Sequence, residues 1–330
     1  DLDLFIGGRN TSYFYGKSPR SYLMVNNGHG HFTDQTIALN KDIANIGMVT
    51  GAVWANITGG PEKELVITGE WMAPRIFSYK NNHLVEIKTN LQDLFGWWQT
   101  VATGDLDGNG YDDLILGNIG ENFYLKPTML SPVKLWINDY DQNTSIDKIL
   151  TRTVDSRDMP VFLKREITDQ IPGIKKQNLR FRDYATKSIQ DLFPKELIDQ
   201  SIVKQFNYPS SIIALNDGKG NFTIVRLPDE VQFSSVNAVK IVDLNNDKKP
   251  DIVLGGNASD FLPQFGRLDA SEGHILMNKG EGAFEYLNSK KSGLKAQGIT
   301  RDIQIIKGRG KRYLLFLENN DFPLFYEINE

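Results

Sequence analysis

Short apolar runs alternate with clusters of Gly, Asn, Asp and Pro along most of this chain. Residues 114–116 and 252–254, for example, are wholly apolar and lead directly to Gly117 and Gly255. Apolar runs of this length, bounded by turn residues, are typical of buried β-strands. The pattern therefore predicts a protein that is built mainly from short strands.

A second pattern predicts tight hairpins between these strands. In residues 23–32, 214–222 and 276–284 an apolar strand runs into a turn rich in Asn and Gly, and an aromatic residue starts the return strand; residues 76–84 are a weaker copy. Asn-Gly and Asp-Gly pairs readily adopt the positive φ angles that tight hairpins require. Together the strands and hairpins recur at roughly the 40–50-residue spacing of propeller blades.

We therefore expect an all-β fold, a six- or seven-bladed β-propeller of four-stranded antiparallel blades, in a single domain over residues 1–330. Residues 155–205 depart from the rhythm and are predicted to be a helical insertion. Residues 178–192 have the spacing of one amphipathic helix, whose inner face would carry Phe181, Ala185, Ile189 and Leu192.

Pro194 suits the first turn of a second short helix, with Leu197 and Ile198 facing inward. The insertion could pack on a blade edge or dock a partner, because insertions in repeat proteins often lie on the binding face.

Three polar loops share one spacing of oxygen-bearing side chains. Positions 1, 3, 5 and 9 are Asp or Asn in every copy, and position 7 offers a backbone carbonyl. Alternate residues of a tightly curled loop point inward together, and Ca²⁺ accepts about six to eight such oxygen ligands. The predicted ligands are Asp105, Asp107, Asn109, Tyr111 and Asp113; Asp139, Asp141, Asn143, Ser145 and Asp147; and Asp243, Asn245, Asp247, Lys249 and Asp251, where Tyr111, Ser145 and Lys249 contribute backbone carbonyls.

An EF-hand shares the first half of this spacing, but it needs a bidentate Glu at position 12 and a helix on each side. Position 12 is Leu116, Leu150 or Leu254 in these loops, and strands follow them. One such loop alone could equally be an Asx-rich turn without a metal. Three loops in phase favour about three structural Ca²⁺ ions.

The first residues of the chain resemble the second half of such a loop. In this alignment Asp3 is at position 9, and positions 1 to 5 would precede Asp1. We therefore expect the chain to be a piece of a longer polypeptide, with a fourth Ca²⁺ at Asp1 and Asp3 only if upstream residues are present. The missing targeting segment then carries no information.

Two further units keep the spacing without the ligands. Residues 56–64 have Thr58 and Gly60 at positions 3 and 5, and residues 307–313 carry Lys and Arg where the other loops have Asp. Because cationic side chains do not ligate Ca²⁺, both turns are expected to form without a metal.

Bulk composition excludes several classes of function. The formal net charge is −4, so the chain has no overall positive charge that would attract nucleic acid. It contains no Cys, which excludes disulfides and thiolate zinc sites. No run of eighteen apolar residues is present, and we expect no membrane span.

Residues 104–117 and 242–256 resemble FG-GAP repeats, the blades of the integrin α-subunit propeller and of bacterial VCBS-repeat proteins. The segments Arg20-Ser-Tyr-Leu, Gly69-Glu-Trp-Met, Gly96-Trp-Trp and Arg157-Asp-Met-Pro are similar to those of large FG-GAP proteins exported to the surface of Bacteroidetes-type bacteria. The resemblance implies Ca²⁺ at positions 1, 3, 5 and 9 of the loops, a propeller that acts as a binding scaffold, and a missing upstream blade or part of one.

These observations favour a Ca²⁺-stabilised scaffold at an extracellular or outer-membrane surface of a bacterium, with a protein partner. A glycan-binding, lectin-like subunit and a polysaccharide-degrading enzyme are the alternatives. The Gly96-Trp97-Trp98 run and the polar-aromatic loop 118–124 are the candidate binding residues, and they could share one face.

An enzyme is the least favoured of the three classes. No Ser, His and Asp pattern has catalytic spacing, and Asp113 of the Asp112-Asp113 pair is already assigned to a cation. The four histidines are predicted to be solvated turn residues: His29, His31, His83 and His274.

Overall fold

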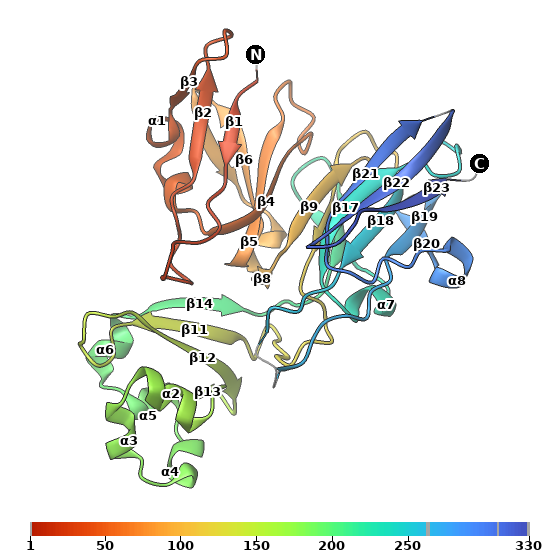
Figure 1. Cartoon of the computed structure of the whole chain (residues 1–330). Helices are drawn as coiled ribbons and strands as arrows, with labels where there is room; N and C mark the ends of the chain where they lie inside the picture. Colours follow the sequence, from red (N-terminus) through yellow and green to blue (C-terminus); the bar gives the residue numbers. More distant parts are fainter. Residues whose placement is uncertain (1, 262–264, 309, 329–330) are drawn as a thin grey trace. The chain divides into compact units, whose positions relative to one another are not determined.

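The computed structural model describes residues 2–261, 265–308 and 310–328. It is mostly β and divides the chain into two compact units (Figure 1). Unit 1 comprises Asp1–Arg9, Ser18–Tyr124 and Pro209–Glu330, and unit 2 comprises Asn10–Lys17 and Leu125–Tyr208.

Unit 1 contains five antiparallel sheets in its described residues. Sheet A consists of β1 (Leu4–Ile6), β2 (Tyr22–Asn26) and β3 (Phe32–Asp34). Sheet B consists of β4 (Met48–Ala55), β5 (Glu64–Met72), β6 (Arg75–Lys80) and β7 (His83–Ile87), with β8 (Gly96–Trp97) paired to β5. Sheet C consists of β9 (Thr100–Gly104), β10 (Asp113–Gly117), β15 (Ile212–Asn216) and β16 (Phe222–Arg226).

Sheet E consists of β17 (Val236–Val242), β18 (Asp251–Gly256), β19 (His274–Gly280) and β20 (Ala283–Leu287). Sheet F consists of β21 (Thr300–Gly308), β22 (Lys311–Glu318) and β23 (Leu324–Ile328). Short helices connect the sheets: α1 (Thr36–Asn40), η1 (Lys41–Asn45), η2 (Asn90–Asp93), α7 (Asp229–Gln232) and α8 (Ser289–Ser292).

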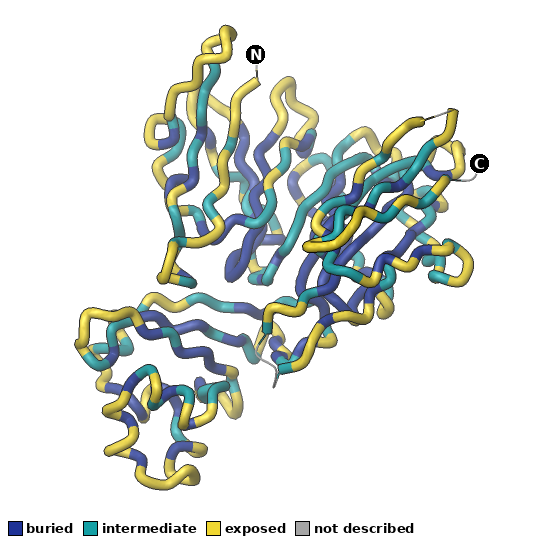
Figure 2. Tube along the Cα trace, in the orientation of Figure 1, coloured by how far each residue is buried: buried dark blue, intermediate teal, exposed yellow. Residues whose placement is uncertain are grey.

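The apolar runs predicted from the sequence are the second strands of these sheets. β5 and β18 are buried along their whole length (Figure 2), and so is β10. Ile115 of β10 packs with Ile252 and Leu254 of β18, and Val253, on the other face of β18, packs with Phe316 of sheet F. Each fully buried side chain of this size stabilises the fold by about 1.5–3 kcal/mol.

The first strands of successive sheets also lie against one another. β4 contacts β9, β9 contacts β17, and β17 contacts β21. Sheets B, C and E therefore repeat one arrangement: a first strand that contacts those of its neighbours, and a second strand that is buried along its whole length. In sheet F the second strand, β22, is only partly buried. The four predicted hairpins are confirmed as β2–β3, β6–β7, β15–β16 and β19–β20.

Unit 2 contains sheet D and five short helices. Sheet D has the order β13-β12-β11-β14, and its strands are β11 (Val133–Asn138), β12 (Asp147–Val154), β13 (Arg157–Pro160) and β14 (Ile202–Phe206). The helices between β13 and β14 are α2 (Lys164–Gln170), α3 (Gly173–Gln177), α4 (Phe181–Ala185), α5 (Ile189–Leu192) and α6 (Lys195–Asp199). Trp136 and Ile149 of the sheet form one apolar cluster with Ile167 and Ile189 of the helices.

Residues 125–208 are inserted between two neighbouring strands of sheet C. β10 pairs with β15, with Leu114 opposite Ala214, although the inserted residues separate them in the sequence. The helices expected in residues 155–205 thus share a compact unit with sheet D and the second polar loop.

Sheet D also differs in strand order from the sheets of unit 1. Its last strand, β14, pairs with its first strand, β11, whereas in sheets C and E the fourth strand pairs with the third. The polar loop 139–147 therefore joins two strands as the other loops do, but in a different sheet topology.

The single amphipathic helix predicted over residues 178–192 is wrong. The chain forms α4 and α5 instead, because the amide and hydroxyl of Ser188 both donate to the carboxylate of Asp191, at 2.8 Å, and start a new helix. Phe181 is 69% exposed, and Tyr184 is the buried aromatic residue of α4. The second short helix is confirmed, with Pro194 just before α6 and with Leu197 and Ile198 against the helical cluster.

Candidate metal sites

The first polar loop curls tightly between β9 and β10. Gly108 and Gly110 have φ angles of +83° and +89°, which glycine adopts without steric cost. The carboxylate of Asp105 accepts hydrogen bonds from the amides of Gly108 at 2.8 Å, Asn109 at 3.1 Å and Gly110 at 3.0 Å. The loop backbone is thereby wrapped around position 1.

The other predicted ligands of this loop turn toward the same point. The Asp107 carboxylate accepts from the Asn109 amide at 3.0 Å, and the Asn109 side chain accepts from the Tyr111 amide at 2.8 Å. One carboxylate oxygen from each of Asp105, Asp107 and Asp113 lies within 4.8 Å of the others. The structure thus brings together the three carboxylates of positions 1, 3 and 9.

The second loop, in unit 2, repeats this geometry. Asp139 accepts from the amides of Asn143 at 3.0 Å and Thr144 at 2.8 Å, and the side chain of Asn143 accepts from Ser145 at 2.7 Å. One oxygen each of Asp139, Asp141 and Asp147 again lies within 4.8 Å of the others.

One atom in the second loop supports the interpretation that these residues could hold a cation. Among the described residues, the Oδ1 atom of Asp141 is buried and has no hydrogen-bond donor. A buried carboxylate oxygen without a partner is costly. A divalent cation that bound at positions 1, 3 and 9 would give this oxygen a partner.

The third loop has the same backbone pattern and also three carboxylates, at positions 1, 5 and 9 instead of 1, 3 and 9. Asp243 accepts from the amides of Asp247 at 3.2 Å and Lys248 at 2.8 Å. In the part of the chain that the structure describes, these three carboxylates do not form a cluster as close as those of the first two loops.

Position 9 is the buried ligand of each loop, and its environment disfavours the bare negative charge. Burial is the largest cause that raises the pKa of Asp113 and of Asp147 to about 6, and neighbouring carboxylates of the same loop contribute. The pKa of Asp251 is raised for the same reasons. A bound divalent cation would reverse this effect, since an opposite charge favours the ionised form.

The loop of residues 56–64 closes through side-chain hydrogen bonds. Glu64 occupies position 9 and accepts from the Ile57 amide at 2.9 Å and from the Thr58 hydroxyl at 2.6 Å. Thr58, at position 3, thus donates to the carboxylate at position 9. In the unit of residues 307–313, Arg312 donates to the carbonyl of Asp243 and, at 3.0 Å, to the side chain of Asn246.

Two asparagines that the sequence analysis did not select connect each loop to the preceding sheet. The Asn216 side-chain amide donates to the carbonyls of Ile57 at 2.8 Å and Asp112 at 3.1 Å. The Asn278 amide donates to Leu106 at 2.8 Å and Pro250 at 3.0 Å. In the sequence these residues are the Asn that opens each hairpin turn, a position that turn geometry alone also explains.

The candidate binding residues outside the loops do lie together. Trp97 packs against Phe123, with ring centroids 5.3 Å apart, and its amide donates to the Asn118 side chain at 3.1 Å. The adjacent Trp98 is fully buried, and its indole nitrogen donates to the carbonyl of Leu94 at 3.2 Å. The prediction of a binding role is therefore wrong for Trp98, which is a core residue, whereas Trp97 is partly exposed.

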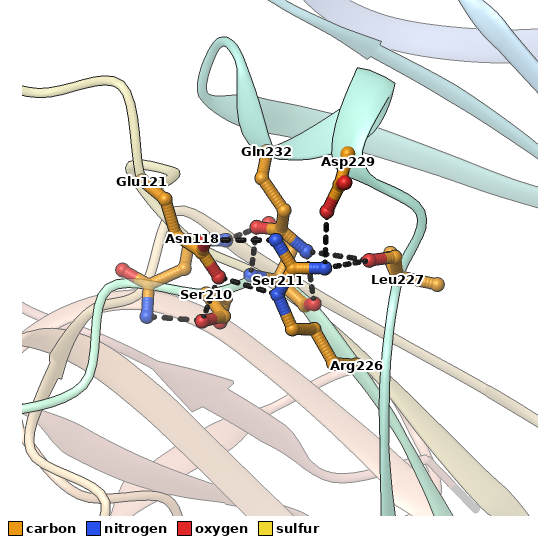
Figure 3. A network of polar contacts seen from close by, with 8 residues as sticks. All are labelled: Asn118, Glu121, Ser210, Ser211, Arg226, Leu227, Asp229 and Gln232. Atoms are coloured by element: carbon orange, nitrogen blue, oxygen red, sulfur yellow. Dashed lines mark hydrogen bonds and ion pairs between the residues drawn. The ribbon is translucent and has the colours of Figure 1, made fainter.

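A charged network fixes loop 118–124 to sheet C (Figure 3). The Arg226 guanidinium donates to both carboxylate oxygens of Glu121, at 2.6 and 2.7 Å, and to Asp229 at 2.7 Å. Ser210 donates to the same Glu121 carboxylate at 2.6 Å, and the Glu121 amide donates to the carbonyl of Gln232 at 2.8 Å. Bidentate Arg–carboxylate pairs are geometrically specific, so this loop is held in one arrangement.

Three of the four histidines are exposed, as predicted: His29, His31 and His83. The prediction is wrong for His274, which is only 5% exposed. Its ring nitrogens contact the hydroxyls of Ser271 and Tyr286, both at 3.1 Å. The neighbouring strand β20 supplies Tyr286, so the turn-like local sequence gave no sign of this pairing.

Comparison with known proteins identifies one part of the chain. No curated protein matches the sequence. In the described part of the chain, no helix has both the length and the apolar character needed to cross a bilayer. Residues 97–127, which contain the first polar loop and β10, match the FG-GAP repeat.

Proposed function

We propose that this protein is a Ca²⁺-stabilised binding or assembly scaffold whose sheets are blades of a six- or seven-bladed β-propeller. The observation that carries the proposal is the gathering of three carboxylates in loop 105–113, inside the segment that matches the FG-GAP repeat. The second loop repeats this cluster and adds the unpartnered oxygen of Asp141. The third repeats its hydrogen bonds.

The role of the cation in this proposal is structural. The carboxylates lie in loops that lead into strands, and backbone amides of the same loop already donate to them. A bound cation would therefore stabilise the conformation of the loop. Ca²⁺ modules outside cells bind with dissociation constants of about 10⁻⁴–10⁻³ M. At a concentration ten times the dissociation constant, one site stabilises the fold by about 1.4 kcal/mol.

The location and the partner follow from the same argument and are part of the proposal. Such weak sites fill outside a cell and remain largely empty in the cytosol, which supports an extracellular or outer-membrane surface of a bacterium. A protein is the proposed partner, because repeat scaffolds present extended surfaces for recognition.

A glycan is a second candidate ligand, favoured by one observation. Trp97 is partly exposed, lies beside Phe123 and is attached to the rigid loop 118–124. An aromatic ring held in this way could stack on a sugar face. A glycan array with wild-type protein and Trp97→Ala tests this candidate: binding that the variant loses supports a lectin, and no binding counts against it.

Calorimetric titration of metal-stripped protein tests the metal sites. We expect about three Ca²⁺ ions per chain, and Asp107→Ala and Asp141→Ala should each lose one. Asp217→Ala is the matched control, because Asp217 accepts similar loop hydrogen bonds in a hairpin turn without a predicted cation. A melting temperature that neither chelator nor Ca²⁺ changes would rule out the structural role.

A further inference from the structure

Three exposed apolar side chains in the helical part of unit 2 lie around one buried lysine. Leu163 is 69% exposed, Leu179 is 82% exposed and Phe181 is 69% exposed. Among the described residues, none of the three belongs to the apolar cluster between sheet D and the helices. Lys164, which follows Leu163 directly, is only 8% exposed. The core of unit 2 therefore leaves these three apolar side chains to the surface.

Lys164 holds residues 179–181 beside α2. Its Nζ atom donates to the carbonyl of Leu179 at 3.1 Å and lies 5.4 Å from the centroid of the Phe181 ring, which is a cation–π contact. The hydroxyl of Tyr184 in α4 donates to the carbonyl of Phe162 at 2.9 Å. The segment with the exposed side chains is thus attached to the start of α2 at two points.

Cationic side chains surround this apolar group. Residues 163–187 contain seven Lys or Arg and only three Asp or Glu, although the whole chain has a net charge of −4. Arg180 and Arg182 alternate with Leu179 and Phe181 in the sequence, and both are exposed. Three further exposed cations lie in the same stretch: Arg165, Lys175 and Lys176.

The acidic residues of this stretch do not neutralise it. Glu166 accepts from the amide of Leu163 at 2.8 Å, and Asp183 accepts from the amide of Arg180 at 3.3 Å. Asp183 also lies 3.7 Å from the guanidinium of Arg182, but both side chains are well exposed, and such pairs interact weakly. Residues 163–187 therefore keep a local positive charge.

This combination fits the surface of a bilayer that contains anionic lipid. Headgroup phosphates attract Lys and Arg, at about fivefold in affinity for each cation near the surface, while exposed apolar side chains enter the boundary between headgroups and acyl chains. Side chains this exposed project from the protein, and a lipid surface needs no complementary pocket to receive them. α4 also lies at the end of unit 2 away from β14 (Figure 1).

We propose that Leu163, Leu179 and Phe181, together with the cations around them, attach this protein peripherally to a bilayer surface rich in anionic lipid. The inference goes beyond the proposed scaffold function. It does not depend on Ca²⁺, because residues 163–187 contain no predicted cation ligand. Three apolar side chains bind lipid weakly without charge attraction, so the attachment is reversible and sensitive to salt.

Sedimentation of the whole chain with lipid vesicles tests the inference at a fixed Ca²⁺ concentration. We expect binding to vesicles of phosphatidylcholine mixed with phosphatidylglycerol, and at least about tenfold weaker binding to phosphatidylcholine alone. Raising the ionic strength from about 0.1 M to about 1 M shortens the Debye length from about 10 Å to about 3 Å and should weaken the binding.

Two pairs of variants separate the apolar contribution from the charge. Leu179→Ser should weaken binding about tenfold, whereas Leu130→Ser should leave it unchanged, although Leu130 is 93% exposed in the same unit. Arg180→Gln combined with Arg182→Gln should weaken binding about twenty-five-fold. Lys195→Gln is the matched control for charge, because Lys195 is exposed and pairs with Asp199.

A single label reports insertion directly, because the chain has no Cys. Leu179→Cys carrying an environment-sensitive fluorophore should shift to the blue on anionic vesicles, and labelled Leu130→Cys should not. A label at position 179 that stays in water overturns the inference, as does binding that Leu179→Ser leaves unchanged or that is equal on both kinds of vesicle. Absence of binding to the anionic vesicles also overturns it and leaves an acidic protein as the partner to test.

Discussion

At the scale of single residues, His274 shows how tertiary contacts set a charge state. Both ring nitrogens contact hydroxyl groups, those of Ser271 and Tyr286. The surrounding burial lowers the pKa of His274 to about 4, although the nearby Glu272 carboxylate acts in the opposite direction. A neutral imidazole can donate to one hydroxyl and accept from the other, so the folded protein favours the uncharged ring.

This low pKa predicts that the protein loses stability in mild acid. The unfolded chain binds a proton at His274 near pH 6.5 and the folded chain only near pH 4, so acid favours the unfolded state between these values. At pH 5 the expected loss relative to pH 7.5 is about 2 kcal/mol. Urea unfolding at both pH values measures it.

The comparison must be made with His274→Gln, which does not titrate. Measured with saturating Ca²⁺, the stability of wild type should fall more than that of the variant on acidification. Parallel loss in both proteins would show that other groups, such as the loop carboxylates, cause the acid sensitivity.

Charges around the third loop predict that the three cation sites differ in affinity. Loop 243–251 has three carboxylates, as loop 105–113 does, but Arg312 donates to its backbone at Asp243 and to the side chain of Asn246. A guanidinium beside the loop opposes the binding of a cation. We therefore expect this loop to bind Ca²⁺ more weakly than loop 105–113.

Arg312→Gln should tighten the weakest calorimetric site about two- to fivefold, which corresponds to the interaction of one partly exposed charge pair. Arg301→Gln is the control, since Arg301 lies in the same sheet and contacts Asn319 instead of the loop. An equal change in both variants would attribute the effect to net charge.

At the scale of elements, the bridging asparagines connect neighbouring sheets at their loops. Asn278 is only 2% exposed and joins the carbonyl of Leu106 in the first loop to that of Pro250 in the third. The conformation of the first loop is therefore coupled to that of the third loop. Asn278→Ala should cost about 2 kcal/mol, because it leaves two buried carbonyls without donors, and it should weaken Ca²⁺ binding at both loops.

Asn26→Ala is the matched control for this prediction. Asn26 has the same place in the hairpin of sheet A, but its side-chain amide donates to Leu2 at 3.3 Å in an exposed setting. In both denaturant unfolding and calorimetry, we expect a large effect for Asn278→Ala and a negligible effect for Asn26→Ala. Equal effects would mean that Asn278 stabilises only its own hairpin turn.

The same scale separates what the sequence could predict from what it could not. The strands, the hairpins and the loop geometry depend on residues within about ten positions, so Asp105, Asp107 and Asp113 could be grouped correctly in advance. The break between α4 and α5 was also local, because Ser188 and Asp191 are a capping pair that the apolar spacing concealed. The bridges of Asn216 and the pairing of β14 with β11 depend on distant segments, and no local pattern shows them.

At the scale of the whole molecule, most of unit 2 is an insertion, residues 125–208, whose flanking residues lie close together in unit 1. The Gly120 amide donates to the carbonyl of Pro209 at 3.0 Å, and these residues flank the inserted stretch 125–208. Adjacent ends are typical of insertions that a host fold tolerates. The inserted stretch also has its own apolar cluster between sheet D and its helices, although unit 2 includes Asn10–Lys17 as well.

Replacing residues 125–208 with a short Gly-Ser linker should therefore leave the five sheets of unit 1 intact. The shortened protein should bind one Ca²⁺ fewer, because loop 139–147 is lost while loops 105–113 and 243–251 remain. Circular dichroism and calorimetry measure the two results, and hydrogen exchange at residues 114–116 reports whether β10 still pairs with β15. A linker of equal length placed within loop 105–113 is the control, since it should remove one ion and also expose β10. Loss of both remaining ions on deletion of the insertion would show that sheet C depends on unit 2 for its closure.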